Sequence, residues 1–170
     1  MSKFYEEITK LKEVLRSGWI LRGVDKGGRV ESDAEHTFSM CLLAMEIIKR
    51  RNLKLDEAKV YKLILCHELG EIDVGDITPF DNVSKDEKKI KEMACIERIA
   101  TLSNMPEIKD LVQEYVDRQT EEAKFVKIID KLDSVLQAKV YAKKYDREDI
   151  YEEFYNSSYD MIKDYIEFLE

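Results

Sequence analysis

Residues 120–137 read TEEAKFVKIIDKLDSVLQ, and their apolar side chains recur with the period of an α-helix. The apolar positions fall every three or four residues and form one face, which comprises Phe125, Ile128, Ile129, Leu132 and Leu136. Thr120 is a favourable N-cap. Asp130 and Asp133 lie beside the apolar face. The stretch therefore predicts a long core helix that carries two carboxylates next to its buried side.

The same helical period extends over most of the chain, and no segment has the alternation of a β-strand. We expect a helix over residues 3–16, a glycine-bearing loop over 19–31, and terminal helices from residue 147 onward. Between them, further helices are predicted to begin at the capping or helix-starting residues Ser32, Asp56, Ser84, Pro106 and Thr120. The predicted fold class is all-α, with residues 1–170 forming a single domain.

Composition and charge restrict the class of protein. The chain has 170 residues, of which 44% are hydrophobic and 38% charged, as expected for one globular domain. A net charge of −8 argues against binding to a nucleic acid polymer, because that binding depends on neutralisation of phosphates by Lys and Arg. Any anionic substrate is therefore expected to be a small molecule.

Compartment is predicted from the start of the chain and from the cysteines. The first residues, MSKFYEEITK, are charged where a signal peptide is apolar, and no apolar run approaches the roughly 20 residues that cross a bilayer. Cys41, Cys66 and Cys95 are odd in number and lie in apolar helical patterns, which favours buried thiols. We expect a cytoplasmic protein that does not associate with a membrane.

The chain contains only two histidines, and both lie on predicted inward faces near helix ends. A single histidine on an apolar face is usually a hydrogen-bonded core residue. Here His36 and His67 each adjoin a glutamate, Glu35 or Glu68, and such a pair is a plausible divalent metal site. Glu71 follows His67 by four residues, so we expect it one turn further along the same helical face, where it could orient a metal-bound water.

Three segments resemble the HD-domain metal phosphohydrolases, a family named for its His and His-Asp metal ligands. They are RVESDAEH before and including His36, CHELGEIDVGDITP from Cys66, and AKFVKIIDKLDS around Asp130. The resemblance is greatest to the 5'-deoxynucleotidase branch, whose members have His-Asp-x-x-Glu followed by Gly-Asp. It covers about residues 11–141 and implies a helical HD-domain bundle, with the terminal helices 147–170 outside the matched core.

The resemblance implies four metal ligands, two acids and one ion per chain. The implied ligands are His36, His67, Glu68 and Asp130. Glu71 is implied to activate or position the attacking water, and Asp76 to lie near the sugar or the leaving group. The ion is one of Mn, Co, Fe, Ni, Zn or Mg.

The sequence departs from the family at Glu68, which stands where the family has Asp. The additional methylene moves the carboxylate by about 1.5 Å, which a site with metal–oxygen bonds of about 2.0–2.3 Å must accommodate. Asp133 shares a face with Asp130 and is an alternative ligand if the helical register shifts.

Phosphate and sugar contacts are predicted in the loop before His36 and in the turn after Glu71. Arg22 and Arg29 are candidate phosphate ligands, with surface charge as the alternative for each. Trp19 is a candidate flat wall for a base or sugar, with core packing as its alternative. Thr78 is a further candidate substrate contact.

These residues together predict a phosphohydrolase that releases phosphate from nucleoside 5'-monophosphates, with deoxynucleotides favoured by the resemblance alone. The alternatives are a nucleotide triphosphohydrolase or phosphodiesterase, or a nucleotide-binding regulator in which Glu68 has weakened catalysis. The resemblance also implies a homodimer, and the aromatic-rich terminal helices are a candidate interface.

Overall fold

The computed structural model describes residues 1–76 and 84–170, and these residues form helices without a β-strand. The predicted all-α fold is confirmed. The α-helices are α1 (Lys3–Thr9), α2 (Ser17–Leu21), α3 (Asp33–Arg51), α4 (Glu57–Cys66), α5 (Glu71–Val74), α6 (Lys85–Ser103), α7 (Glu107–Asp117), α8 (Glu121–Tyr145) and α9 (Glu148–Ile162). Three 3-10 helices complete the set, at Lys10–Lys12, Val24–Lys26 and Lys163–Phe168.

The long helices begin at the residues that the sequence predicted as caps. The side chains of Ser32, Asp56, Ser84 and Thr120 each accept a hydrogen bond from a backbone N–H in the first turn that follows. Ser32 also forms the predicted capping box, since the Glu35 carboxylate accepts from its backbone N–H at 2.8 Å. These caps are local, so the starts of α3, α4, α6 and α8 could be read from the sequence.

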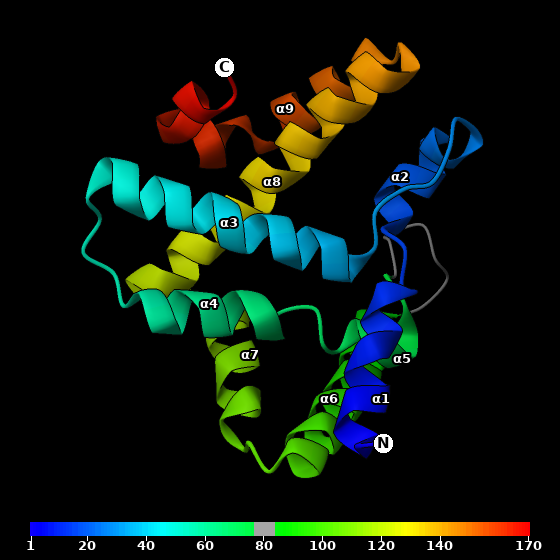
Figure 1. The fold of residues 1–170 in the computed structure, drawn as a ribbon, viewed down its shortest axis with the longest axis vertical. Coiled ribbons are helices and arrows are strands. Elements are labelled where there is room, and N and C mark those ends of the chain that lie inside the picture. The colour runs from blue at the N-terminus through cyan, green and yellow to red at the C-terminus, as the bar shows by residue number, and fades with distance from the viewer. Residues whose placement is uncertain (77–83) are drawn as a thin grey trace.

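Helix α8 forms the centre of the molecule and packs against α3, α4, α7 and α9 (Figure 1). The buried side of α8 coincides only partly with the predicted apolar face. Phe125, Ile129 and Leu132 are buried as predicted, but so are Asp130 and Asp133, which the sequence placed beside the core. Around α8, α3 and α4 lie side by side, and α9 runs back along α8.

The N-terminal segment differs from its prediction in two places. The helix expected over residues 3–16 ends at Thr9 and continues as a short 3-10 helix. The chain then extends, because the Asp33 backbone N–H donates to Val14 O at 2.9 Å and the Arg16 N–H to Glu31 O at 3.0 Å. This pairing with a segment that follows by some 17 residues removes those backbone groups from helical hydrogen bonding.

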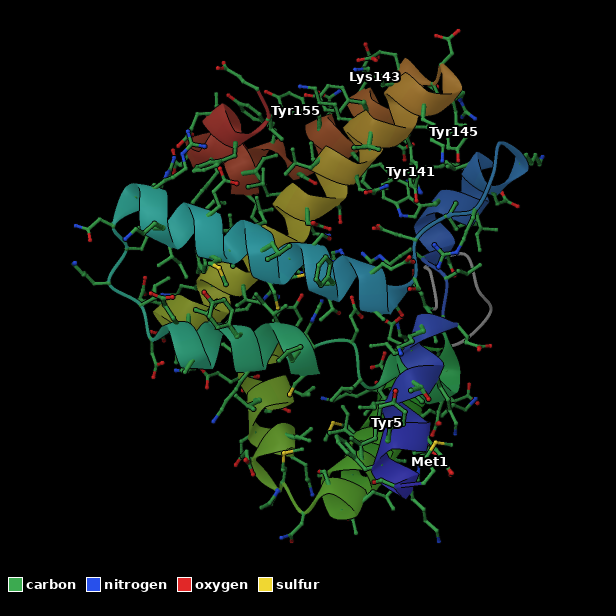
Figure 2. All side chains as sticks on the ribbon, in the orientation of Figure 1. Met1, Tyr5, Tyr141, Lys143, Tyr145 and Tyr155 are labelled. Atoms are coloured by element: carbon green, nitrogen blue, oxygen red, sulfur yellow. The ribbon has the colours of Figure 1, made fainter. Side chains whose placement is uncertain are left out.

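The predicted loop over residues 19–31 contains helical structure, which is the second difference. Ser17–Leu21 forms α2, and Val24–Lys26 forms a 3-10 turn. Burial explains why this segment is helical, because Trp19 is 2% exposed and packs between Phe154 and Tyr141. Figure 2 shows Tyr141 and Tyr145 extending from α8 toward this segment.

In the described ranges, no helix is both long enough and apolar enough to cross a bilayer. The three cysteines are free: Cys66 and Cys95 are buried and Cys41 is half-buried.

Candidate metal centre and its pocket

The two histidines approach each other from α3 and from the end of α4. The capping box starts α3 at Ser32, which places His36 in the first turn with its side chain fully buried. His67 is the C-cap of α4. Their ring centroids are 5.8 Å apart. Residues separated by 31 positions are therefore brought into one site by the packing of α3 against α4.

Each imidazole uses one nitrogen for a structural contact and leaves the other without a partner. His36 Nδ1 lies 2.7 Å from Asp133 Oδ2, and His67 Nδ1 lies 2.6 Å from Ile64 O. In the described part of the chain, neither Nε2 atom has a hydrogen-bond partner. A carboxylate or carbonyl that holds Nδ1–H fixes the tautomer in which Nε2 offers a lone pair to a metal.

Asp130 completes a group of three ligand atoms with the histidines. One ligand atom from each of His36, His67 and Asp130 lies within 4.8 Å of the others. Asp130 Oδ1 is 3.4 Å from His36 Nε2. Two imidazole nitrogens and a carboxylate oxygen suit a first-row divalent ion. These three residues, with their two unpartnered nitrogens, therefore fit the metal that the family implies.

Asp130 also accepts hydrogen bonds that orient its second oxygen. Tyr115 Oη donates to Asp130 Oδ2 at 2.9 Å, and Lys127 Nζ donates to the same oxygen at 2.6 Å. Burial raises the pKa of Asp130, but its contact with His36 and the charge of Lys127 outweigh burial and lower it well below its usual value. The carboxylate is thus held in its ionised, metal-binding form.

Glu68 stands next to this group and is shared between a histidine and an arginine. Its Oε1 lies 3.1 Å from His67 Nε2 and accepts a hydrogen bond from Arg16 Nη1 at 2.9 Å. Burial raises the pKa of Glu68, but the charges of His67 and Arg16 outweigh burial and lower the pKa. Arg16 Nη1 is also 3.6 Å from the buried Asp33. The guanidinium therefore lies between two carboxylates at the edge of the candidate metal site.

The group opens into a pocket of about 320 Å³ that is lined by both acidic and basic side chains. His67, Glu68 and Asp130 line it at one end. The other acids are Glu71, Asp76 and Glu92, and the cations are Arg16, Lys127 and Lys131. A pocket with this composition accommodates an anion beside a divalent ion, with carboxylates available for proton transfer.

Burial, followed by the neighbouring charges of Glu68 and Asp76, raises the pKa of Glu71 to about 9. Lys88 Nζ lies 3.3 Å from Glu71 Oε1, whereas Oε2 has no partner in the described residues. Asp76 Oδ2 accepts a hydrogen bond from the Ser17 backbone N–H at 2.7 Å. Glu71, which lies near Lys88, and Asp76, which accepts from a backbone N–H, therefore share one pocket in different environments.

The predicted relation between His67 and Glu71 is wrong in its local structure. Helix α4 ends at Cys66, and Glu71 opens the separate helix α5. The turn between them contains Gly70, where a Cβ atom would lie 3.0 Å from Glu92 Cβ on α6. Glu71 nevertheless lines the same pocket as His67. Asp133, the alternative metal ligand, contacts the opposite nitrogen of the same imidazole. Asp133 lies next to His36 Nδ1, whereas Asp130 faces His36 Nε2.

Three predicted substrate contacts are not brought to this pocket. Trp19 lies in the core, and its Nε1 donates to Glu31 at 2.9 Å. Arg22 forms an ion pair with Glu153, and Arg29 a bidentate pair with Glu35. These positions agree with the alternatives stated for them, core packing and surface charge. Thr78 lies outside the described residues.

Sequence reasoning missed four pocket residues: Arg16, Tyr115, Lys127 and Lys131. Arg16 precedes Trp19 by three residues, so an arginine one turn before the buried tryptophan was the available signal. Lys127 and Lys131 flank Asp130 at helical spacing and could have been proposed as its neighbours. Tyr115 is on a different helix and left no signal in the sequence.

Comparison with known proteins places this geometry in a family. A family model described as HD domain matches residues 8–169. The chain is 40% identical over 149 residues to "5'-deoxynucleotidase HDDC2" of Dictyostelium discoideum, a match that covers 83% of this chain and 77% of that protein. The human protein of the same name is 35% identical over 142 residues, 82% of this chain and 67% of that protein.

Solved structures agree with the sequence matches. A conserved hypothetical protein from Pyrococcus furiosus superposes with a TM-score of 0.75 and 28% identity, over 98% of this chain and 92% of that one. A predicted metal-dependent phosphohydrolase from Magnetospirillum magnetotacticum has a TM-score of 0.66 and 30% identity, over 79% of this chain and 67% of that one. The family model and the sequence matches both cover most of the chain, and the chain belongs to the HD-domain family.

Proposed function

We propose that this protein is a metal-dependent phosphohydrolase that releases phosphate from nucleoside 5'-monophosphates, with deoxynucleotides as the preferred class. The names of its relatives support the reaction and the substrate class. The observation that carries the proposal is the pair of buried, unpartnered Nε2 atoms beside Asp130, at the end of a pocket that contains both acids and cations.

One divalent ion per chain is proposed, held by His36, His67 and Asp130 with Glu68 as the fourth ligand. The ion is Mn, Co, Fe, Ni, Zn or Mg. When bound, such an ion polarises a phosphoryl oxygen and lowers the pKa of a bound water. Support for Glu68 comes from its Oε1, which lies 3.1 Å from His67 Nε2.

The chain's own side chains would bind the phosphate and transfer the protons. Arg16, Lys127 and Lys131 supply positive charge in the pocket. Glu71 would orient the attacking water, or take its proton, as the water oxygen bonds to phosphorus. The bond from phosphorus to the sugar oxygen then breaks, and that oxygen takes up a proton from the pocket acids or from solvent to leave as the alcohol. Asp76 is proposed to lie near that oxygen or the sugar. Thr78 remains a predicted contact.

An assay of nucleotide hydrolysis tests the reaction. Protein stripped by a chelator is incubated with Mn, Co, Mg or Zn and with mono-, di- and triphosphates and cyclic nucleotides. Release of inorganic phosphate from 5'-monophosphates supports the proposal. Pyrophosphate or triphosphate release would indicate a triphosphohydrolase, diester cleavage a phosphodiesterase, and nucleotide binding without turnover a regulator.

Metal content tests the ligands separately from activity. His36→Ala and His67→Ala should each lower the bound metal by a large factor when the proteins are analysed for elements after dialysis, because each removes one nitrogen ligand. Unchanged metal content in both variants would contradict the site.

The cellular setting is also a proposal. We propose a cytoplasmic homodimer that acts on a small-molecule substrate and consists of one HD domain over residues 1–170. Three free cysteines are consistent with a reducing compartment, and the family match over residues 8–169 supports one domain.

A further inference from the structure

A second cavity, separate from the candidate metal pocket, lies between α1, α3, α4 and α7. It measures about 430 Å³, and apolar side chains form nearly all of its surface, among them Phe4, Ile8, Leu11, Leu65 and Leu69. The two cavities have no lining residue in common. We call it the apolar pocket.

An apolar stripe on the exposed side of α3 adjoins this pocket. Ala34 and Thr37 line the pocket, and Phe38, Leu42 and Met45 continue from them along the helix. Phe38 is 68% exposed, and Leu42 and Met45 are each 51% exposed. On the adjacent helix α4, Leu65 lines the pocket and is 56% exposed. We call Phe38, Leu42, Met45 and Leu65 the α3–α4 apolar face.

Contiguous exposed apolar side chains of this size usually mark an interaction surface. The terminal helices, which the sequence offered as an interface, use most of their aromatic residues inside the chain instead, although Tyr159 is 43% exposed. Phe154, Tyr155, Tyr165 and Phe168 all pack against the main core cluster. Among the described residues, the α3–α4 apolar face is therefore a better candidate interface than the terminal helices.

Shape and charge indicate a second copy of this chain as the partner. A projecting Phe38 beside a hollow apolar pocket is self-complementary, since a two-fold axis brings the same patch of both protomers together. Lys62 and Glu107 both line the pocket, so opposite charges can meet across such an axis. A chain with a net charge of −8 repels its copies, which favours contact through a face with little net charge.

We propose that the α3–α4 apolar face and the apolar pocket form the interface of a homodimer, in which Phe38 of each protomer fills the pocket of its partner. This inference rests on the homodimer proposed above. Thr37 follows His36 and Cys66 precedes His67, so the interface would pack behind both metal-binding segments.

Sedimentation velocity over a range of protein concentrations tests the interface. Wild type should sediment as a dimer, and Phe38→Glu should weaken the dimer by about 30-fold or more, as for a buried interface anchor. Leu65→Glu on α4 should also weaken the dimer. Both side chains are more than half exposed, so the variants should retain wild-type circular dichroism and melting temperature.

Val140→Glu is the matched control, because Val140 is 54% exposed and lies on α8. It should sediment as wild type. A monomeric wild type would overturn both the dimer and the interface, and stoichiometric binding of the dye ANS to that monomer would assign the pocket to a small apolar ligand. Dimers in both Phe38→Glu and Leu65→Glu, or a monomer in Val140→Glu, would overturn the interface alone. None of these readouts depends on phosphatase activity.

Discussion

Glu68 is the residue at which this chain departs from the His-Asp ligand pair of its family. Its longer side chain allows one oxygen to lie near His67 Nε2 and to accept a hydrogen bond from Arg16. Arg16 in turn lies close to the buried Asp33. Arg16, in addition to any bound metal, thus balances the charge of Glu68. This pairing influences how much Glu68 contributes to metal affinity.

Substitution of Glu68 tests that contribution. Glu68→Ala should lower metal affinity by about 10-fold or more, because a negative ligand and the partner of Arg16 are both removed. Glu68→Asp should retain the metal, since the ligand type and charge are kept. Metal titration by calorimetry measures both, with the exposed Glu57→Ala as a control. Full metal binding by Glu68→Ala would make this residue a bystander.

Glu71 differs from Glu68 because it forms a separate group of acids with Asp33 and Asp76, and because burial and the charges of Glu68 and Asp76 raise its pKa to about 9. Glu71→Gln keeps the size and removes the proton acceptor. It should lower kcat by about 10²–10⁴-fold, while metal content and KM change little.

Glu92→Gln is the control for Glu71, because Glu92 lines the same pocket and also pairs with Lys88. It should leave kcat within about threefold of wild type, as expected for a surface ion pair outside the reaction. Steady-state kinetics on a 5'-monophosphate compare the two variants. Wild-type turnover in Glu71→Gln would remove Glu71 from the mechanism.

At the scale of the element, α8 presents two acids to one imidazole. Asp130 and Asp133 are three residues apart, so they lie one turn apart on the side of α8 that faces α3. Asp130 Oδ1 is 3.4 Å from His36 Nε2, and Asp133 Oδ2 is 2.7 Å from His36 Nδ1. One helix thereby supplies both a candidate ligand and the residue that orients another ligand.

Asp133→Asn tests this division of roles. Loss of the charge behind His36 Nδ1 should weaken metal binding by about 10- to 100-fold without abolishing it. Asp130→Asn should have the larger effect, because it changes an oxygen that faces the ion. Metal affinity is measured by competition with a chelator, with the exposed Asp160→Asn as a control. The reverse order of the two effects would exchange the roles of Asp130 and Asp133.

At the scale of the whole molecule, three distant segments meet where Asp33 is buried. The backbone of Asp33 pairs with Val14, and its side chain lies near Arg16. Its carboxylate oxygen lies within 4.8 Å of those of Glu71 and Asp76. In the described residues neither oxygen of Asp33 has a hydrogen-bond partner. Burial, followed by the charge of Glu68, raises its pKa from 3.8 to about 7.

Asp33 should therefore make the stability of the metal-free protein depend on pH. A raised pKa means that Asp33 contributes stability below about pH 4 and that this stability is lost as pH rises through about 7. Asp33→Asn cannot ionise, so its free energy of unfolding relative to wild type should increase by up to about 4 kcal/mol between pH 4 and pH 8. Urea denaturation at several pH values measures this difference. A difference that is constant with pH would contradict the prediction.

The sequence by itself determined the all-α fold, the starts of the long helices and the residues of the candidate histidine centre. Helical periodicity and caps such as Ser32 and Thr120 act within one or two turns, so they can be read without knowledge of the fold. His36, His67 and Asp130 could be named from motifs, and the structure brings their ligand atoms within 4.8 Å of one another.

Only the tertiary structure decided which other side chains surround that centre. Arg16 reaches Glu68 because the backbone of residues 14–16 leaves the predicted helix and pairs with residues 31–33. Trp19 is buried because α8 and α9 supply aromatic neighbours for it. These contacts join residues that are 15 to 135 positions apart, and a pattern that repeats every 3.6 residues contains no information about them.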